Sequence, residues 1–131
     1  MNLLDIIYPN PFLQSLFPQG LSNELLVGKV EFDSGGHSWL TIHTKQRTQT
    51  TVKKWGEYGK DYNRTAIRLS ICNSKKVSVV EWFNADYLPV DIIKKDDKGC
   101  IFRQRGEVFY IEIEAEFFSF HSCDAYLNDE I

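Results

Sequence analysis

The chain has 131 residues, of which 43% are hydrophobic and 14% aromatic, and its formal net charge at pH 7 is −3. This length suits a single domain (residues 1–131), and the aromatic content excludes a disordered chain, because large rings supply much of the buried area that offsets chain entropy. An odd number of cysteines without CxxC spacing excludes a disulfide framework and indicates a reducing, cytoplasmic location.

The N-terminal segment MNLLDIIYPNPFLQSLF is apolar, but Asp5 and two prolines interrupt it and no basic region precedes it. Neither a signal peptide nor a membrane span is therefore expected. Asn10 can cap a short helix and Pro11 suits its first turn, so the pattern predicts a helix over residues 10–17 that ends at Pro18. We expect this helix to plug one end of a sheet layer.

Alternating apolar and polar residues predict strands through the rest of the chain. These strands cover residues 25–33, 39–44, 67–71, 76–83, 87–93, 100–104 and 107–121. Tight turns at 34–37 and 73–74 predict hairpins, and Pro89 limits its strand to a sheet edge or a strand start. The pattern predicts a mainly β fold, in which antiparallel sheets form a small sandwich or open barrel of about seven or eight strands with one short N-terminal helix.

Three glutamates, Glu112, Glu114 and Glu116, alternate with apolar residues in the last predicted strand. Successive side chains of a strand point to opposite faces, so the glutamates share one face while the apolar residues pack on a core. Phe118 and Phe120 fall on the glutamate side. A β-bulge, or a strand that passes from exposed to covered, would explain this switch.

The C-terminal part of the chain is strongly acidic, because residues 107–131 carry seven acids and no Lys or Arg, whereas residues 1–106 carry all fifteen Lys and Arg. Such a surface favours a basic protein partner and repels nucleic acid. The alternative is a solvated strand face that lysines on neighbouring strands balance. The candidate partner-binding residues are Glu112, Glu114, Glu116, Asp124, Asp129 and Glu130.

Residues 45–62 form the longest irregular stretch and hold a secondary candidate surface, Lys53, Lys54 and Trp55. Bases beside an aromatic ring are typical of single-strand nucleic-acid surfaces. The low density of bases and the sequence pI of about 5.6 oppose that function. We therefore expect Trp55 to pack over a sheet edge while the lysines keep it soluble.

His121 and Cys123 lie two residues apart, so an extended strand would place both on one face, and His43 could join them as a metal ligand. A structural zinc site usually shows two closely spaced ligand pairs, and only one weak pair is present. We expect no metal and predict that the cysteines are buried as small hydrophobic residues.

The residue types of a nucleophilic triad, His121, Cys123 and Asp124, occur together, but neighbouring strand positions point the wrong way for a triad. Glutamates on one strand face lie about 7 Å apart, which is compatible with two-carboxylate hydrolysis, yet an exposed stripe lacks the burial that tunes a catalytic pKa. No P-loop, GxGxxG, GxSxG or HExxH motif occurs. We expect no catalytic residue and no cofactor.

The order of several elements resembles the immunity protein 50 family of bacterial polymorphic-toxin systems. The similarity rests on NPFLQSLF, ELLVGKVEFDSGGHSWLTIHT, KKW at 53–55, NRTAIRLSICNSKKVSVVEWF and IEIEAEFFSFHS. The resemblance implies a small cytoplasmic antitoxin that is not an enzyme and that binds and neutralises a cognate toxin. If that toxin is a nuclease, the acidic face could occupy its basic cleft as a phosphate mimic.

Two other functions are compatible with the sequence. A β-barrel or sandwich could bind a small ligand between its sheets, with residues 45–62 as a lid. A small hydrolase could use Glu or His, which would require perturbed carboxylates converging with His121 in a cleft. The oligomeric state stays open at this level.

Overall fold

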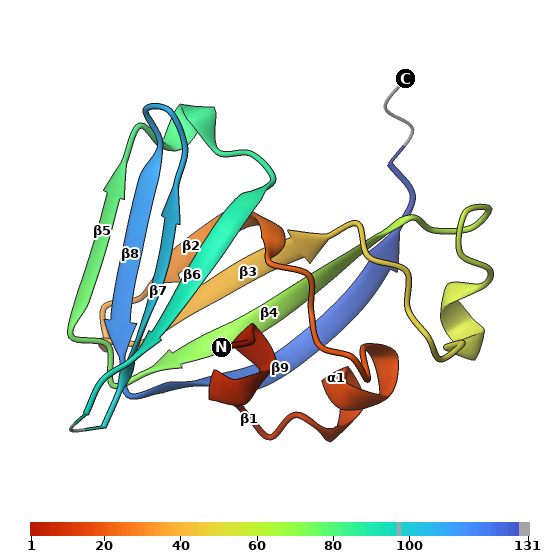
Figure 1. Cartoon of the computed structure of the whole chain (residues 1–131), viewed down its shortest axis with the longest axis horizontal. Coiled ribbons are helices and arrows are strands. Elements are labelled where there is room, and N and C mark those ends of the chain that lie inside the picture. The colour runs from red at the N-terminus through yellow and green to blue at the C-terminus, as the bar shows by residue number, and fades with distance from the viewer. Residues whose placement is uncertain (97, 129–131) are drawn as a thin grey trace.

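Nine strands form one mixed sheet within residues 1–96 and 98–128, the part of the chain that the structure, a computed structural model, describes (Figure 1). The strands are β1 (Ile7–Tyr8), β2 (Glu24–Phe32), β3 (Ser38–Thr44), β4 (Arg64–Cys72), β5 (Lys76–Val80), β6 (Leu88–Lys94), β7 (Cys100–Arg105), β8 (Tyr110–Ala115) and β9 (Phe117–Tyr126). The helical segments are η1 (Leu3–Ile6), α1 (Pro11–Leu16), η2 (Lys53–Trp55) and η3 (Trp82–Asn84). With 50% strand and 13% helix in an open sheet, the predicted mainly β class is confirmed.

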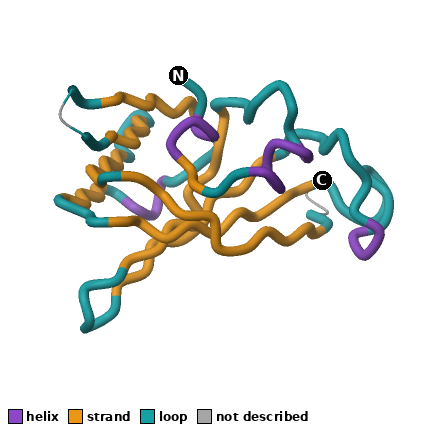
Figure 2. The backbone as a smooth tube through the Cα atoms, turned by 90° about the horizontal axis from the view of Figure 1, so that it is seen from below, coloured by secondary structure: helices purple, strands orange, loops and turns teal. Residues whose placement is uncertain are grey.

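The sheet has the strand order β1-β9-β4-β3-β2-β6-β7-β8-β5 and divides where β2 meets β6. Two residue pairs join these strands, Glu24 with Pro89 and Leu25 with Leu88, so Pro89 stands at a strand start as predicted. We call β1, β9, β4, β3 and β2 the five-strand half, and β6, β7, β8 and β5 the four-strand half. Figure 1 shows the two halves at an angle to one another, and Figure 2 places the η2 loop at the opposite end of the molecule from the β6–β7 turn.

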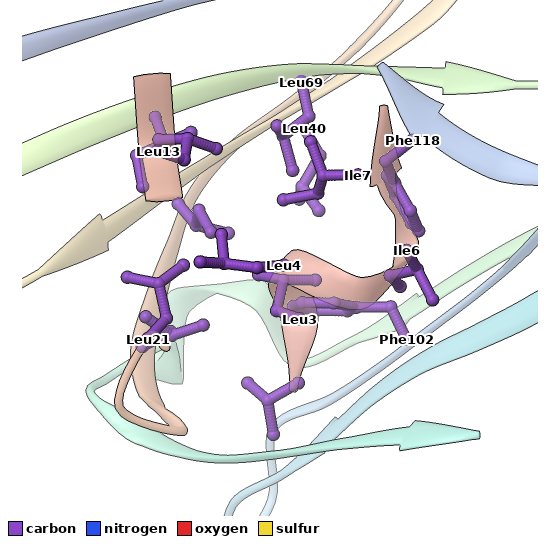
Figure 3. Close-up of a cluster of buried hydrophobic side chains, with 14 of the residues drawn as sticks. Leu3, Leu4, Ile6, Ile7, Leu13, Leu21, Leu40, Leu69, Phe102 and Phe118 are labelled. Atoms are coloured by element: carbon purple, nitrogen blue, oxygen red, sulfur yellow. The ribbon is translucent and has the colours of Figure 1, made fainter. Parts of the chain in front are cut away.

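The N-terminal segment packs between the inner faces of the two halves (Figure 3). The side chains of this cluster are all 5% exposed or less: Leu3, Leu4, Ile6, Ile7, Leu13, Leu21, Leu40, Leu69, Phe102 and Phe118. The rings of Phe102 on β7 and Phe118 on β9 lie 6.3 Å apart and link the halves directly. The expected plug is therefore made by η1 as well as by α1.

Asn10 does not cap α1 with its side chain, because its Nδ2 donates to the Leu4 carbonyl at 2.8 Å. The side-chain cap lies one helix earlier. Asn2 Oδ1 accepts from the Leu4 N–H, and Asp5 Oδ2 accepts from the Asn2 N–H, each at 3.0 Å, which is a capping box at the start of η1. Asn10 therefore ties the start of α1 back to η1.

The chain crosses between the halves twice, and the two crossings lie side by side. The predicted hairpin between residues 67–71 and 76–83 is wrong, because β4 pairs with β3 and β9 whereas β5 pairs with β8. The predicted strand 107–121 is likewise two strands, which bend apart at Glu116. The Glu116 N–H donates to the Cys72 carbonyl at 3.0 Å, and Asn73 Nδ2 donates to Glu116 Oε2 at 2.6 Å.

These crossings explain the switch in alternation at Phe118. The inner face of β8 and the inner face of β9 belong to different halves, so the apolar phase restarts after Glu116. A register shift follows in β9, where Leu69 pairs with Phe120 and Arg68 with Ser122, so that His121 is the bulged residue. Of the two expected explanations, the change of cover accounts for the switch at Phe118, because the bulge at His121 lies after it.

The predicted strand 76–83 ends at Val80. Glu81 has φ 55, a left-handed conformation that few residues other than glycine adopt, and the chain then turns into η3. The apolar pair Trp82 and Phe83 consequently leaves the sheet.

Candidate protein-interaction surfaces

Glu112 is tied to both neighbouring strands. Its Oε1 accepts from Arg103 Nε on β7 at 3.1 Å and from the Tyr110 hydroxyl at 2.7 Å, while its Oε2 accepts from Lys76 Nζ on β5 at 3.1 Å. The hydrogen bonds from Tyr110, Lys76 and Arg103 lower the pKa of Glu112 to about 2. Its side chain is 13% exposed. This carboxylate is therefore compensated by its neighbours.

The other two glutamates of the stripe have partners in the connections next to the strands. Glu114 Oε1 lies 2.6 Å from Lys95 Nζ, and this hydrogen bond lowers the pKa of Glu114. Glu116 sits at the crossing and accepts from Asn73. Lys76 on β5 is the lysine on a neighbouring strand that the alternative expected, whereas Lys95 reaches Glu114 from the turn after β6.

The structure does not gather the candidate acidic residues into one surface. Glu112 and Glu114 lie on the outer face of the four-strand half, whereas Asp124 lies exposed on β9, opposite Ala66, in the five-strand half. The predicted residues Asp129 and Glu130 lie outside the described residues. The sequence could not show that Glu112 and Glu114 lie apart from Asp124, because it does not reveal that the strands before and after Glu116 belong to different halves.

Trp55 is 9% exposed, and its ring meets Phe12 and Tyr62 edge-on at centroid distances of 6.1 and 5.8 Å. Trp55 is thus buried, with ring contacts to α1 and to Tyr62 just before β4, and Lys53 and Lys54 stay exposed beside it. The Gln49 N–H donates to the Leu16 carbonyl at 2.8 Å, so this loop is anchored to α1. A polar hollow of about 460 Å³ opens in the loop, lined by Arg47, Thr48, Gln49, Thr51, Gly56, Glu57, Tyr58 and Tyr62.

The three histidines lie apart and have separate partners. His43 Nδ1 lies 2.5 Å from the Tyr126 hydroxyl, and burial lowers the pKa of His43. His121 lies at the bulge beside Arg68, whereas Cys123 is buried on the inner face. Within residues 1–96 and 98–128, no group of three or more His, Cys, Asp or Glu could hold a metal ion.

Burial disfavours the thiolate form of all three cysteines. Burial raises the pKa of Cys100 to about 11 and the pKa of Cys123 to about 12, and burial also raises the pKa of Cys72. The nucleophile is the thiolate, so these thiols are poor nucleophiles at neutral pH.

An exposed apolar surface around η3 was not anticipated from the sequence. Its exposed fractions are 96% for Phe83, 55% for Val108, 50% for Val80, 40% for Trp82 and 38% for Val79. We call these five residues the η3 surface. The turn between β7 and β8, which carries Val108, lies beside η3 (Figure 1). Residues 81–83 read as the end of a strand in the sequence, and only the left-handed turn at Glu81 brings Phe83 into solvent.

A groove continues the η3 surface toward β2. Val79 and Trp82 line it together with Gly28, Lys29 and Val30, and its volume is about 420 Å³. The Trp82 ring is supported from below by Phe109 at 6.1 Å. Trp82 is therefore held in place while one side of its ring faces the groove.

Three carboxylates surround the η3 surface: Glu81, Asp86 and Glu107, all exposed. Unlike Glu112 and Glu114, none of them forms an ion pair with another residue among 1–96 and 98–128. The apolar centre thus has an uncompensated acidic rim.

Comparison with protein-family models, curated proteins and solved structures found no match. In the described part of the chain, no helix has the length and apolar character to cross a membrane.

Proposed function

We propose that this chain is a non-enzymatic, cytoplasmic immunity protein that binds a cognate polymorphic toxin and neutralises it. The observation that carries the proposal is the η3 surface, in which Phe83 is 96% exposed beside Trp82 and Val108. Contiguous exposed apolar residues ringed by polar ones mark protein-interaction sites in soluble proteins. The resemblance to the immunity protein 50 family supplies the class of partner.

The composition of the η3 surface suits a protein partner. Interface cores are enriched in aromatic residues, and tryptophan is prominent among the residues whose truncation costs most binding energy. Trp82 is backed by Phe109, so little side-chain entropy is lost when a partner covers it. The rim of Glu81, Asp86 and Glu107 would steer a basic partner toward the apolar centre.

The acidic strand is a second candidate interface for the same toxin. Glu112 and Glu114 are engaged by Lys76, Arg103 and Lys95, so a partner that used them would first have to compete with these bases. The uncompensated acids around η3 carry no such cost. If the toxin is a nuclease, they supply the phosphate-mimicking charge that we expected of the strand.

Ligand binding between the sheets is the alternative function. The space between the two halves holds Leu4, Ile7 and Phe102, all 1% exposed or less, and a ligand there would have to displace them (Figure 3). The groove at Val79 and Trp82 is the apolar site that a small molecule could enter without this displacement.

The test is co-expression with the C-terminal toxin domain of a large secreted protein whose gene neighbours this one. Wild-type protein should restore growth and bind the purified toxin domain, whereas Phe83→Ser should lose most of the binding. Leu127→Ser is the matched control, because Leu127 is also exposed, at 43%, but lies after β9 in the five-strand half. Failure of the wild type to bind or protect would refute the proposed function.

A second variant set separates the two candidate interfaces. Replacing Glu112, Glu114 and Glu116 together with Gln should leave toxin association within about twofold if the η3 surface is the interface. A large loss in this variant, with Phe83→Ser unaffected, would move the interface to the acidic strand.

A further inference from the structure

The strand β5 ends the sheet, and its outer edge is open. β5 pairs with β8 from Lys76 to Val80 and is the last strand in the sheet order. Figure 1 shows it at the outer margin of the four-strand half, while η3 turns away from that margin toward β6. A strand in this position presents one row of backbone N–H and C=O groups to solvent.

β5 carries one of the usual protections of an edge strand, the lysine Lys76, and lacks the others. Such strands are commonly guarded by a proline, a bulge, a lysine or very short length. β5 contains no proline, and its register with β8 is continuous over five residue pairs. The Lys76 ammonium is turned to Glu112 at 3.1 Å. By contrast β1, at the opposite end of the sheet, has two residues.

The residues around β5 form complementary pairs when the β5 strands of two copies are placed antiparallel. A two-fold axis normal to the sheet at Ser78 would pair Val77 with Val79 of a second copy, and Lys76 with Val80. The same register sets Lys75 of each copy opposite Glu81 of the other, so one such pair forms at each end of the paired strands. Lys75 and Glu81 are both exposed, and they flank the strand at its two ends. Opposite charges at facing positions favour strand pairing, and like charges oppose it.

We propose that two copies of this chain associate through antiparallel β5–β5 pairing about Ser78, so that the four-strand halves join into one sheet across the dimer. Val79 is 38% exposed and gains cover from Val77 of the second copy. The pairing involves Val79 and Val80 of the η3 surface, whereas Trp82 and Phe83 lie beyond the end of β5, so each copy of the dimer still presents these two aromatic residues. This inference does not rest on the proposed function.

The interface is short, so the dimer is expected to be weak, with a Kd on the order of 100 μM. Sedimentation equilibrium of the wild-type protein from about 10 μM to 1 mM should therefore show a monomer–dimer equilibrium. Lys75→Glu places Glu opposite Glu81, and Glu81→Lys places Lys opposite Lys75. Each single variant should raise the Kd about tenfold or more, because two attractive pairs become repulsive.

A mixture of the two single variants makes the test specific. A heterodimer of Lys75→Glu with Glu81→Lys regains two opposite-charge pairs, so the equimolar mixture should dimerise as the wild type does. Lys60→Glu, an exposed loop lysine, is the matched control and should leave the Kd unchanged. Thermal unfolding of each variant would separate lost folding from lost association. A wild type that is monomeric at about 1 mM, or a mixture that fails to regain dimerisation, would overturn the proposal.

Discussion

Arg103 on β7 holds Glu112 on β8 through two nitrogens, with Nε 3.1 Å and a terminal guanidinium nitrogen 3.0 Å from the same carboxylate oxygen. Lys76 reaches the other oxygen from the opposite side, so three adjacent strands share one carboxylate. The acidic stripe is thus a crosslink on the outer face of the four-strand half. This relationship defines the first prediction.

The protein should become less stable as the pH is lowered, because Glu112 becomes protonated. Its pKa is lowered from the ordinary 4.5 to about 2 by hydrogen bonds from Tyr110, Lys76 and Arg103. A carboxyl with a depressed folded-state pKa contributes stability above its unfolded pKa and loses that contribution as the pH falls through its folded pKa. Glu112→Gln should therefore lower Tm at pH 6, and its difference from the wild type should shrink between pH 4.5 and pH 2.

Thermal unfolding by circular dichroism over this pH range checks the effect. The control is Glu107→Gln, since Glu107 makes no ion pair with another residue in 1–96 or 98–128. A Tm difference for Glu112→Gln that stays constant down to pH 2 would contradict the prediction.

Two phenylalanines should differ sharply in their effect on stability. Phe102 is fully buried against Phe118, so Phe102→Ala leaves a cavity and should cost about 3–5 kcal/mol. Phe83 is 96% exposed, so Phe83→Ala should change the free energy of unfolding by no more than about 0.5 kcal/mol. Urea denaturation measures both, and a Phe83→Ala loss as large as that of Phe102→Ala would show that Phe83 is part of the core.

Cys100 and Cys123 should resist thiol–disulfide exchange in the native protein. Burial raises the pKa of Cys100 to about 11 and of Cys123 to about 12, so both are protonated at pH 8. Cys72 is half-buried and should react first. Native protein treated with a disulfide reagent at pH 8 should release at most one equivalent of thiolate within minutes, and the guanidinium-unfolded chain should release three. Rapid release of all three from native protein would be inconsistent with the structure.

Gly28 and His43 should be energetically coupled. A Cβ at Gly28 would overlap the His43 imidazole, which contacts Tyr126 at 2.5 Å. Gly28→Ala should therefore displace His43 and cost about 1–3 kcal/mol. In a His43→Ala background the same substitution meets open space and should cost under about 0.5 kcal/mol, which a double-mutant cycle measures. Equal costs in both backgrounds would instead indicate a backbone effect at Gly28, where the register of β2 with β3 shifts between Val27 and Lys29.

Alternation of apolar and polar residues was sufficient to predict most strands, because burial on one face imposes a period of two. It located β2, β3, β7 and the Pro89 strand start closely. It could not predict strand partners. The sequence of β4 and β5 looks like a hairpin, yet Asn73 and Glu116 meet where the chain changes halves, and that contact depends on residues more than forty positions apart.

The same limit applies to the candidate site. The sequence identified the glutamates but not Lys76, Arg103 and Lys95 as their partners, because cross-strand neighbours follow from strand order. It also could not indicate that Phe83 is exposed, because Glu81 adopts a left-handed conformation without being a glycine. Composition indicated that residues 107–131 are acidic. The strand order determines which of these acidic side chains have a basic partner and which do not.

The pairing of β1 with β9 has a consequence for how the chain is made. Ile7 lies beside Phe118, so β1 leaves the ribosome long before the strand with which it pairs. Until then the leucines and isoleucines of the N-terminal segment have only part of their core, and contacts this distant in sequence form slowly. The apolar side chains of residues 1–21 should therefore stay incompletely covered in the nascent chain until β9 has emerged.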